Sequence, residues 1–367
     1  MTPPRFRPTW VEVDLDAIRH NVGALKPAGA ALMAVVKADG YGHGAGKVAR
    51  AATEAGAAWL GVALVEEGVE LRLAGLEAPI LVLSELPPRS EAVALAHGLT
   101  ATVCSEAGLA RLAASARGPI GVHVKVDTGM HRIGVWPPED AALFCQRVVA
   151  AGLFVEGLWT HFAKSEDDEV TTKEQLDALL RALEAIRAAG HEPRWVHASN
   201  SGAVLRHPEA DLDLVRPGIS LYGLAPEPGV GADRDLHPAL AWRSAVALVR
   251  RLPAGERLSY GHRYELQRAS WVATVPMGYA DGYPRSLSNR ADVLIGGHRC
   301  RVVGSVTMDQ LIVDCGDREV AAGDEVVLLG RQGEEEVTAW ELARHLDTVA
   351  YEIVTRIGPR VPREYVG

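Results

Sequence analysis

The sequence has few cysteines, few aromatic residues and no long apolar run. Its four cysteines, out of 367 residues, form no C-x-x-C pair, so neither a zinc finger nor a disulfide framework is indicated and a reducing compartment is expected. No stretch approaches the roughly 20 apolar residues of a membrane span. The N-terminal MTPPRFRPTWVEVDLDAI lacks the apolar core of a signal peptide. We therefore expect a cytoplasmic protein without a metal and without a membrane partner.

The charge balance is also uninformative about macromolecular partners. A formal net charge of -9 gives no reason to expect nucleic acid or anionic lipid as a partner. Apolar residues make up 48% and charged residues 23% of the chain, which is ordinary for a globular protein. The length allows two domains, or one large barrel with an appendage.

Short apolar runs alternate with segments of helical spacing through the first two thirds of the chain. The runs are Leu32–Lys37, Trp59–Ala63, Ile80–Leu83, Thr100–Val103, Val122–Val126, Phe154–Trp159, Trp195–His197 and Leu212–Val215. The helical segments include Lys47–Ala55, Glu66–Leu73, Ala107–Ala116, Ala141–Ala150 and Lys173–Ala189. This alternation predicts parallel βαβ units, and eight runs suit a (β/α)8 barrel. An open doubly wound sheet is the alternative, but no G-x-G-x-x-G follows the first run.

The pattern changes to a mainly β domain after about residue 235. The strand-like runs are Ser244–Arg250, Trp271–Pro276, Asp292–Ile295, Arg301–Val306, Gln310–Asp314 and Glu325–Leu329, with one helix near Ala339–Leu346. We therefore predict an α/β protein with a barrel over residues 1–235 and a β domain over residues 236–367. Residues 1–15, which contain the alternating V-E-V-D-L of Val11–Leu15, could pair with the second domain.

The stretch AVVKADGYGHG, Ala34–Gly44, places one lysine where a buried strand passes into a glycine-rich loop. Burial lowers the pKa of an ammonium group and makes the amine nucleophilic, so Lys37 is a candidate for forming a Schiff base. The alternative is that Lys37 only extends its charge to water from the strand end. These residues alone do not separate the two interpretations.

Other polar residues also follow the predicted strands, where the chemistry of such barrels lies. In V-H-V-K-V-D-T-G the valines suit the outer face, so Lys125 should point inward and needs a partner or a chemical modification. His123, which has no evident partner in the sequence, is interpreted as an ordinary surface residue or a satisfied core residue. Ser201 and the amides near Gly218 follow the seventh and eighth strands, where phosphate is often bound. A phosphate site with an amine nucleophile favours pyridoxal phosphate (PLP), with a cofactor-free sugar-phosphate aldolase or isomerase as the alternative.

Nine motifs together resemble those of alanine racemases. They are AVVKADGYGHG, KVDTGMHRIG, WTHFA, HASNSGA, RPGISLYG, LSYG, PMGYADGYPR, VTMDQ and YEIVTRIG, in the order typical of that family. The resemblance covers nearly the whole chain. It implies a PLP-dependent enzyme with an N-terminal (β/α)8 barrel and a C-terminal β domain, working as a homodimer with shared active sites, and a small amino acid, alanine, as substrate.

The resemblance also implies roles for individual residues. Lys37 would hold PLP as an internal aldimine and serve as one base, and Tyr260 would be the second base. Lys125 resembles a lysine that is carbamylated in many relatives. Further cofactor contacts would be Tyr41, Leu83, Arg132, His161, Asn200, Ser201, Arg216, Gly218, Ile219 and Tyr351. Arg132 would also contact the substrate carboxylate, together with Met308 and Asp309 from the partner subunit, and Tyr279 and Tyr351 would line the entrance.

Arg216 and His161 have a specific expected relation. Arg216 resembles the partner of the pyridine nitrogen, with His161 as its support. The sequence departs from the family at Thr307, where a cysteine is frequent, and at Ser305, where an arginine is common. These departures bear on access and rate more than on the reaction.

The expected function is the interconversion of L- and D-alanine, which supplies D-alanine for peptidoglycan. A serine or broad-specificity racemase of the same fold is the nearest alternative. A decarboxylase of diamino acids is disfavoured by Arg216, since such enzymes generally place an acid at the ring nitrogen. A non-catalytic PLP-binding barrel is disfavoured by the second domain with Tyr260.

Overall fold

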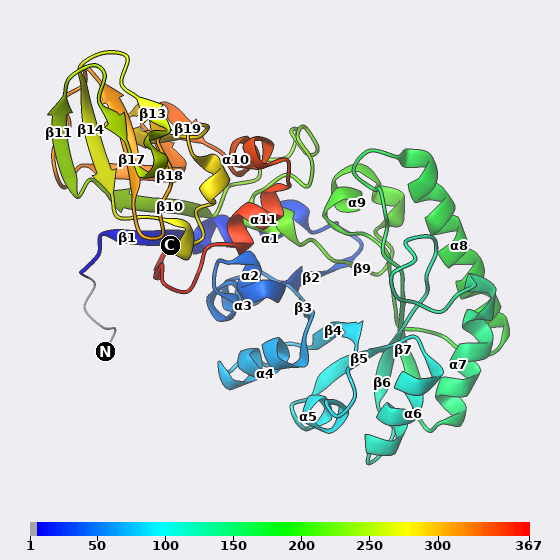
Figure 1. The fold of residues 1–367 in the computed structure, drawn as a ribbon. Coiled ribbons are helices and arrows are strands. Elements are labelled where there is room, and N and C mark those ends of the chain that lie inside the picture. The colour runs from blue at the N-terminus through cyan, green and yellow to red at the C-terminus, as the bar shows by residue number, and fades with distance from the viewer. Residues whose placement is uncertain (1–5) are drawn as a thin grey trace. The chain divides into compact units, whose positions relative to one another are not determined.

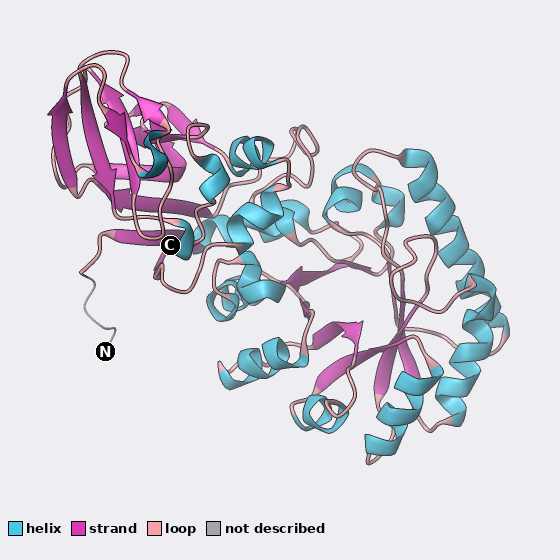
Figure 2. Cartoon of the chain, in the orientation of Figure 1, coloured by secondary structure: helices cyan, strands magenta, loops and turns pink. Residues whose placement is uncertain are grey.

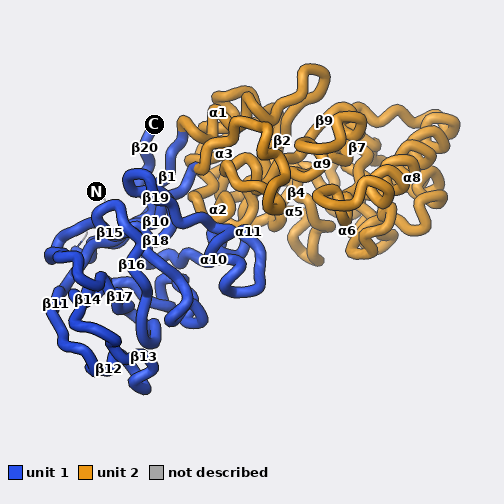
Figure 3. The backbone as a smooth tube through the Cα atoms, turned by 90° about the horizontal axis from the view of Figure 1, so that it is seen from above, with its two compact units in different colours: residues 1–15, 239–367 blue, residues 16–238 orange. Residues whose placement is uncertain are grey.

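The computed structural model describes residues 6–367, which form two compact units. One unit spans Asp16–Pro238, and the other comprises Ala239–Gly367 together with the N-terminal residues up to Leu15. Figure 3 colours the two units separately. The second unit is therefore made of two segments that are separated in the sequence by residues 16–238.

The unit of residues 16–238 is a barrel of eight parallel strands. Its strands are β2 (Ala31–Val35), β3 (Trp59–Val62), β4 (Ile80–Glu85), β5 (Leu99–Val103), β6 (Gly121–Lys125), β7 (Phe154–Trp159), β8 (Trp195–His197) and β9 (Leu214–Val215). Hydrogen bonds join them in the order β8-β7-β6-β5-β4-β3-β2-β9. The ring closes between β8 and β9, where the N–H of Asp213, the residue before β9, donates to Val196 O at 3.0 Å. The predicted (β/α)8 barrel is confirmed.

Helices follow the strands and lie outside the ring (Figures 1 and 2). They are α1 (Leu15–Leu25), α3 (Ala45–Glu54), α4 (Val65–Leu73), α5 (Glu91–Ala96), α6 (Glu106–Ser115), α7 (Ala141–Ala150), α8 (Glu169–Ala188) and α9 (Ser201–Arg206), with the short element α2 (Lys37–Tyr41) directly after Val36. Side-chain caps explain where several begin. Ser105, Asp168 and Asn200 accept hydrogen bonds from the first turns of α6, α8 and α9.

The strands of the barrel are buried on both faces, which explains their continuous apolar runs. All four residues of β3 are buried. Met33, Trp59, Leu81 and Leu214 come from four strands and pack together as one core cluster. A strand packed on both sides cannot carry polar residues along its length, so the polar side chains are concentrated where the strands end.

The second unit is mainly β. Its strands are β1 (Thr9–Asp14), β10 (Leu240–Ala245), β11 (Leu248–Leu252), β12 (Arg257–Leu258), β13 (Tyr264–Glu265), β14 (Ser270–Val275), β15 (Asp292–Ile295), β16 (His298–Val303), β17 (Leu311–Gly316), β18 (Glu325–Gln332), β19 (Glu335–Val337) and β20 (Arg363–Val366), with helices α10 (Ala339–Leu346) and α11 (Ala350–Thr355). The main sheet runs β11-β14-β17-β16-β15-β18-β10-β1-β20. The N-terminal strand β1 pairs antiparallel with β10 and parallel with β20.

One predicted strand, Ser244–Arg250, is wrong in its extent, because the run is divided between β10 and β11. The division falls at Val246 and Ala247, whose amides bond to different neighbours. Val246 N donates to Asp324 O at 2.9 Å, and Ala247 N donates to Thr274 O at 2.8 Å. An apolar run alone does not show such a change of partner. Within residues 6–367, no helix is long and apolar enough to cross a membrane.

Candidate active site

The turn after Lys37 is wound in the left-handed sense. The four residues that follow Lys37 have φ angles between 51° and 61°, and only Gly40 among them lacks a Cβ atom. A left-handed conformation costs a residue with a side chain roughly 1–2 kcal/mol. Strain of this kind persists only where surrounding contacts hold it, and it is concentrated at functional sites.

Glu67 of α4 is one of the groups that hold this turn. Its Oε1 accepts a hydrogen bond from Ala38 N at 2.7 Å, and its Oε2 accepts from Ala63 N at 2.8 Å. Asp39 Oδ1 also accepts from Ala45 N at 2.9 Å, at the start of the next helix. The carboxylates therefore fix the backbone that follows the lysine and tie it to the end of β3.

Lys37 is half-buried at the carboxyl end of the barrel strands. Burial lowers the pKa of its amine, and the positive charge of Arg132 lowers it further, while Glu67 opposes the shift. The neutral amine is the nucleophilic form. The environment thus favours the nucleophile over a lysine that only extends its charge to water.

Three of the predicted phosphate ligands lie together in the barrel. Ser201 Oγ accepts hydrogen bonds from Gly218 N at 2.9 Å and from Ser220 N at 3.3 Å. A Cβ atom on Gly218 would stand 2.4 Å from the Tyr41 hydroxyl, so only glycine fits there. Burial raises the pKa of Tyr41, which therefore stays a protonated donor. Ile219 follows directly and is fully buried.

Arg216 is completely enclosed by neutral acceptors. Its Nη1 donates to His197 Nδ1 at 2.9 Å, and its Nη2 donates to the carbonyls of Thr160 and Ala198, both at 2.8 Å. No described carboxylate forms an ion pair with it. The guanidinium keeps its charge at neutral pH, so this charge is available to a group bound in the barrel.

The bond from Arg216 determines the tautomers of two histidines. Because arginine has only donors, His197 Nδ1 must be an acceptor and its Nε2 must carry the proton. His197 Nε2 then donates to His123 Nδ1 at 2.9 Å. Burial and the charge of Arg216 lower the pKa of both rings, that of His123 to about 3. His123 is therefore a hydrogen-bonded core residue, which agrees with one of the two interpretations from the sequence, but its partner His197 could not be identified there.

Lys125 points into the barrel, as its alternation with the valines indicated. Its Nζ donates to Ile133 O at 2.9 Å and lies 5.0 Å from the centre of the Trp159 ring. Arg216 lies over the same ring at 4.9 Å. Burial lowers the pKa of Lys125 to about 8, and the charges of Arg132 and Arg216 contribute. A larger fraction of its amine is therefore neutral near pH 7 than in an ordinary lysine.

Arg132 stands in the loop after β6, whose shape depends on Asp127. Asp127 Oδ1 accepts hydrogen bonds from Gly129 N and His131 N, both at 3.0 Å. Burial alone would raise the pKa of Asp127, but these bonds outweigh it and the pKa is lowered. Arg132 itself is exposed and forms no ion pair with a described residue, so its charge is available to an anion.

The remaining predicted residues of the barrel lie near these groups or support them. His161 is half-buried, and burial followed by the charge of Arg216 lowers its pKa well below the usual value. The hydrogen bonds of Arg216 go to His197 and not to His161, so sequence reasoning missed the direct support. Leu83 packs on the core cluster with Met33. Asn200 Oδ1 caps α9 and accepts from Ser165 Oγ at 2.6 Å.

The other unit gathers a second group of predicted residues around one pocket of about 600 Å³. Its lining includes Tyr260, Tyr279, Met308 and Asp309, together with Arg285. Tyr260 is 75% exposed on its own unit. Asp309 is held by Arg360, whose Nη2 donates to it at 2.7 Å. The structure therefore brings together residues that lie almost 50 positions apart in the sequence.

Tyr351 does not line this pocket. It lies half-buried on α11 of the same unit. Its predicted contact with a phosphate group stays a prediction.

Known families match both units. The model described as "Alanine racemase, N-terminal domain" matches residues 13–226, and the one described as "Alanine racemase, C-terminal domain" matches residues 239–365. The chain belongs to the alanine racemase family.

Individual members of the alanine racemase family resemble the chain over its whole length. An alanine racemase of Symbiobacterium thermophilum is 52% identical, with 99% of this chain and 98% of that protein covered. The crystal structure of the enzyme from D-cycloserine-producing Streptomyces lavendulae has a TM-score of 0.94 and 42% identity, covering 99% of this chain and 98% of that one. The Bacillus anthracis enzyme with bound L-Ala-P has a TM-score of 0.93 and 37% identity, covering 99% and 96%.

The residues of this family member fit PLP. Lys37, Lys125, Arg132 and Arg216 bring four cationic side chains to one end of the barrel, where the charge of Arg132 lowers the pKa of both lysines. Such a set suits an anionic group. The close approach of Gly218 to the Tyr41 hydroxyl forms a cradle that a Cβ atom would fill.

The two departures from the alanine racemase motifs have structural roles. Ser305 Oγ donates to Tyr260 O at 3.1 Å, and Ser305 O accepts from Ser259 Oγ at 2.7 Å. Thr307 Oγ1 donates to Gln310 O at 2.8 Å and closes the turn that presents Met308 and Asp309. Ser305 therefore positions the backbone of the tyrosine, and Thr307 positions the neighbouring wall of the pocket.

Proposed function

We propose that the chain is a PLP-dependent racemase that interconverts L- and D-alanine with two bases, Lys37 and Tyr260. The observation that carries the proposal is the lowered pKa of Lys37, whose amine shares one end of the barrel with a phosphate cradle and an arginine that has only neutral partners. We further propose a cytoplasmic enzyme that supplies D-alanine for peptidoglycan.

The proposed cofactor is held by residues of the barrel. Lys37 would bind PLP covalently, and Tyr41, Ser201, Gly218 and Ile219 would bind its phosphate. When bound, PLP withdraws electrons from the α-carbon and stabilises the carbanion left by loss of the α-proton. Leu83, His161, Asn200 and Tyr351 complete the proposed set.

Racemisation requires one proton to leave the α-carbon on one face and another to arrive on the opposite face. A neutral Lys37 can take the proton of D-alanine, and a deprotonated Tyr260 can take that of L-alanine. Each group then returns a proton in the reverse direction. An ordinary tyrosine has a pKa of about 10, so Tyr260 requires positive charge nearby to act as a base, and Arg285 lines the same pocket.

Arg216 would limit side reactions. It can donate to the pyridine nitrogen but cannot give up a proton to it, so the nitrogen stays unprotonated and withdraws fewer electrons. The carbanion is then reprotonated quickly, which favours racemisation over transamination. The neutral relay through His197 and His123 supports this role because it holds the guanidinium without neutralising it.

Lys125 is proposed to be carbamylated. Its neutral amine would attack carbon dioxide, forming an N–C bond and releasing one proton, and the product carries a negative charge. This anion would then hold Arg132, which has no ion-pair partner among the described side chains. The pKa of about 8 supports the proposal, because only the neutral amine reacts.

We propose that the enzyme works as a homodimer in which Tyr260, Met308 and Asp309 serve the site of the partner subunit. The exposure of Tyr260 on its own unit supports this arrangement, since a side chain 75% exposed is free to meet a second copy. Alanine is the proposed substrate, with serine or a broader range as the alternative.

The test is to measure racemisation of L-alanine against L-serine, L-lysine and L-arginine, together with exchange of the α-proton in heavy water. Because the two alanine isomers have equal free energy, Tyr260→Phe should slow both directions equally, by about 100-fold or more. The variant should still exchange the α-proton of D-alanine, because Lys37 catalyses that step. Exchange of the α-proton of L-alanine should be abolished.

Tyr264→Phe is the matched control. This tyrosine lies in the same unit but bonds to Asp314 at 3.1 Å, outside the pocket. Equal loss of exchange on both isomers in Tyr260→Phe would contradict the assignment of one base to each face. Faster turnover of serine than of alanine would contradict the substrate.

A further inference from the structure

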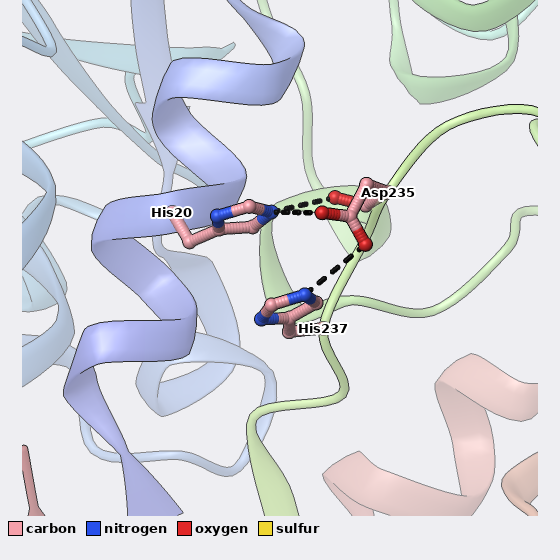
Figure 4. A group of neighbouring side chains, drawn as sticks. All are labelled: His20, Asp235 and His237. Carbon is pink, nitrogen blue, oxygen red and sulfur yellow. Dashed lines mark hydrogen bonds and ion pairs between the residues drawn. The ribbon is translucent and has the colours of Figure 1, made fainter.

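Three side chains far apart in the sequence form an exposed cluster on the barrel unit. His20 comes from helix α1, and Asp235 and His237 come from the segment that ends the unit (Figure 4). Their ligand atoms all lie within 4.8 Å of one another. None of them belongs to the candidate active site, and the sequence pattern had indicated no metal.

The backbone that carries this cluster is held by a buried side chain. Asn21, next to His20, is fully buried and bonds to both backbone groups of His237. Its Nδ2 donates to His237 O and its Oδ1 accepts from His237 N, both at 2.8 Å. A Cβ atom on Gly223 would stand 1.9 Å from His237 O, so the segment also packs tightly on the barrel side. His237 is therefore placed beside α1 by contacts that do not involve its ring.

The two imidazole rings are aligned. They stack with their centres 3.9 Å apart and their planes 7° from parallel. His20 Nε2 lies 2.8 Å from the main-chain carbonyl oxygen of Asp235 and 3.2 Å from its Oδ2, and His237 Nε2 lies 3.1 Å from its Oδ1. Figure 4 shows Asp235 to one side of the stacked rings, next to the nitrogen atoms that the dashed lines join to it.

We propose that His20, Asp235 and His237 bind a zinc ion. Zinc–ligand bonds of about 2.0–2.1 Å in a tetrahedron separate neighbouring ligand atoms by about 3.3 Å. The two nitrogen–oxygen distances in the structure are close to that separation. Zinc lies in the plane of each imidazole that binds it, so the two exposed rings, which are stacked in this structure, would turn apart until both Nε2 atoms face the ion. On zinc binding the proton of each neutral ring would move from Nε2 to Nδ1, which leaves Nε2 free to bind the ion.

The ligand set selects the class of metal. Two imidazole nitrogens and one carboxylate oxygen suit zinc and similar transition metals, whereas calcium and magnesium prefer oxygen alone. The side chains of His20, His237 and Asp235 are 38%, 52% and 77% exposed. An ion can therefore enter from solvent, and water completes its coordination.

Zinc at this site would tie α1 to the end of the barrel unit. A ligand that binds only the folded state stabilises it by mass action. The role is structural, because the candidate catalytic residues of the barrel lie elsewhere.

The experiment uses the full-length holoenzyme without a histidine tag, stripped of metal by a chelator. Zinc binding is measured by calorimetry, and cobalt is used as a coloured substitute. We expect one zinc per chain at free zinc of about 10 μM, and a rise in melting temperature. Mutation of a group that only orients a metal ligand typically lowers the affinity for the metal about 10- to 100-fold. Loss of a ligand itself should cost at least as much, so His20→Gln, His237→Gln and Asp235→Asn should each weaken zinc binding by more than about tenfold.

His298→Gln is the control, since His298 is an exposed histidine of the other unit. It should bind zinc like the wild type, and all four variants should keep their racemase activity in metal-free buffer. Absence of zinc uptake by the wild type would overturn the proposal. Uptake that is unchanged in His20→Gln and His237→Gln would overturn it as well, because the zinc would then lie elsewhere, for example on the cofactor phosphate.

Discussion

The arrangement of the two bases can be tested by combining defective subunits. Lys37 lies in the unit of residues 16–238 and Tyr260 in the unit of residues 239–367. If each active site takes Lys37 from one subunit and Tyr260 from its partner, then a dimer of one Lys37→Ala chain and one Tyr260→Phe chain has one intact site and one doubly defective site. Such a hybrid should have about half of the wild-type activity in a two-fold symmetric dimer.

The hybrid is obtained by coexpressing the two chains with different affinity tags and purifying on both. D-alanine formation is then followed with a D-amino acid oxidase. The informative control pairs a wild-type chain with a chain that carries both substitutions. In this second hybrid each shared site has lost one base, so it should be inactive.

The two hybrids give opposite results if each subunit uses its own two bases. The first would then be inactive, and the second would keep about half of the activity. That outcome would refute the shared site and leave the assignment of the bases in place. Inactivity of both hybrids would refute the expected subunit composition itself.

Three further predictions concern the surroundings of the cofactor. Arg216→Glu should increase transamination, measured as pyruvate formed per racemisation turnover; an unchanged ratio would contradict the role given to the arginine. At pH 7 a lysine of pKa about 8 is roughly 10% neutral, against about 0.03% for an ordinary lysine, and this fraction rises with pH. Activity should therefore fall when carbon dioxide is removed and return with bicarbonate, and Lys125→Met should abolish this response. Gly218→Ala should weaken PLP binding by about tenfold or more through overpacking against Tyr41, measured by fluorescence titration, whereas Gly118→Ala, with nothing within 4 Å of its Cβ position, should not.

Much of the barrel could be predicted because its strands are buried on both sides. The eight apolar runs correspond to β2 through β9, and the polar residues at their ends indicated where to look for chemistry. Lys125 could be placed inside the barrel from alternation alone. The inward side chain and its need for a partner follow from the period of a strand, which does not depend on tertiary contacts.

Other features depend on contacts that the sequence does not display. The left-handed turn after Lys37 contains non-glycine residues that prefer other conformations, and it depends on Glu67 from a different helix. The direct support of Arg216 is His197 rather than His161, although each histidine lies near the carboxyl end of a predicted strand. A choice between two such histidines is set by side-chain geometry inside the barrel, which periodicity cannot supply.

The position of β1 has a consequence for biosynthesis. This strand is made before the barrel, yet its two neighbours in the sheet, β10 and β20, begin only at Leu240 and Arg363. While the ribosome makes the barrel, β1 has neither hydrogen-bonding partner and exposes Val11 and Val13, which are fully buried in the finished unit. Strand β20 thus pairs with a strand made more than 300 residues earlier, and a nascent chain released before residue 363 leaves one edge of β1 open to pairing with another chain.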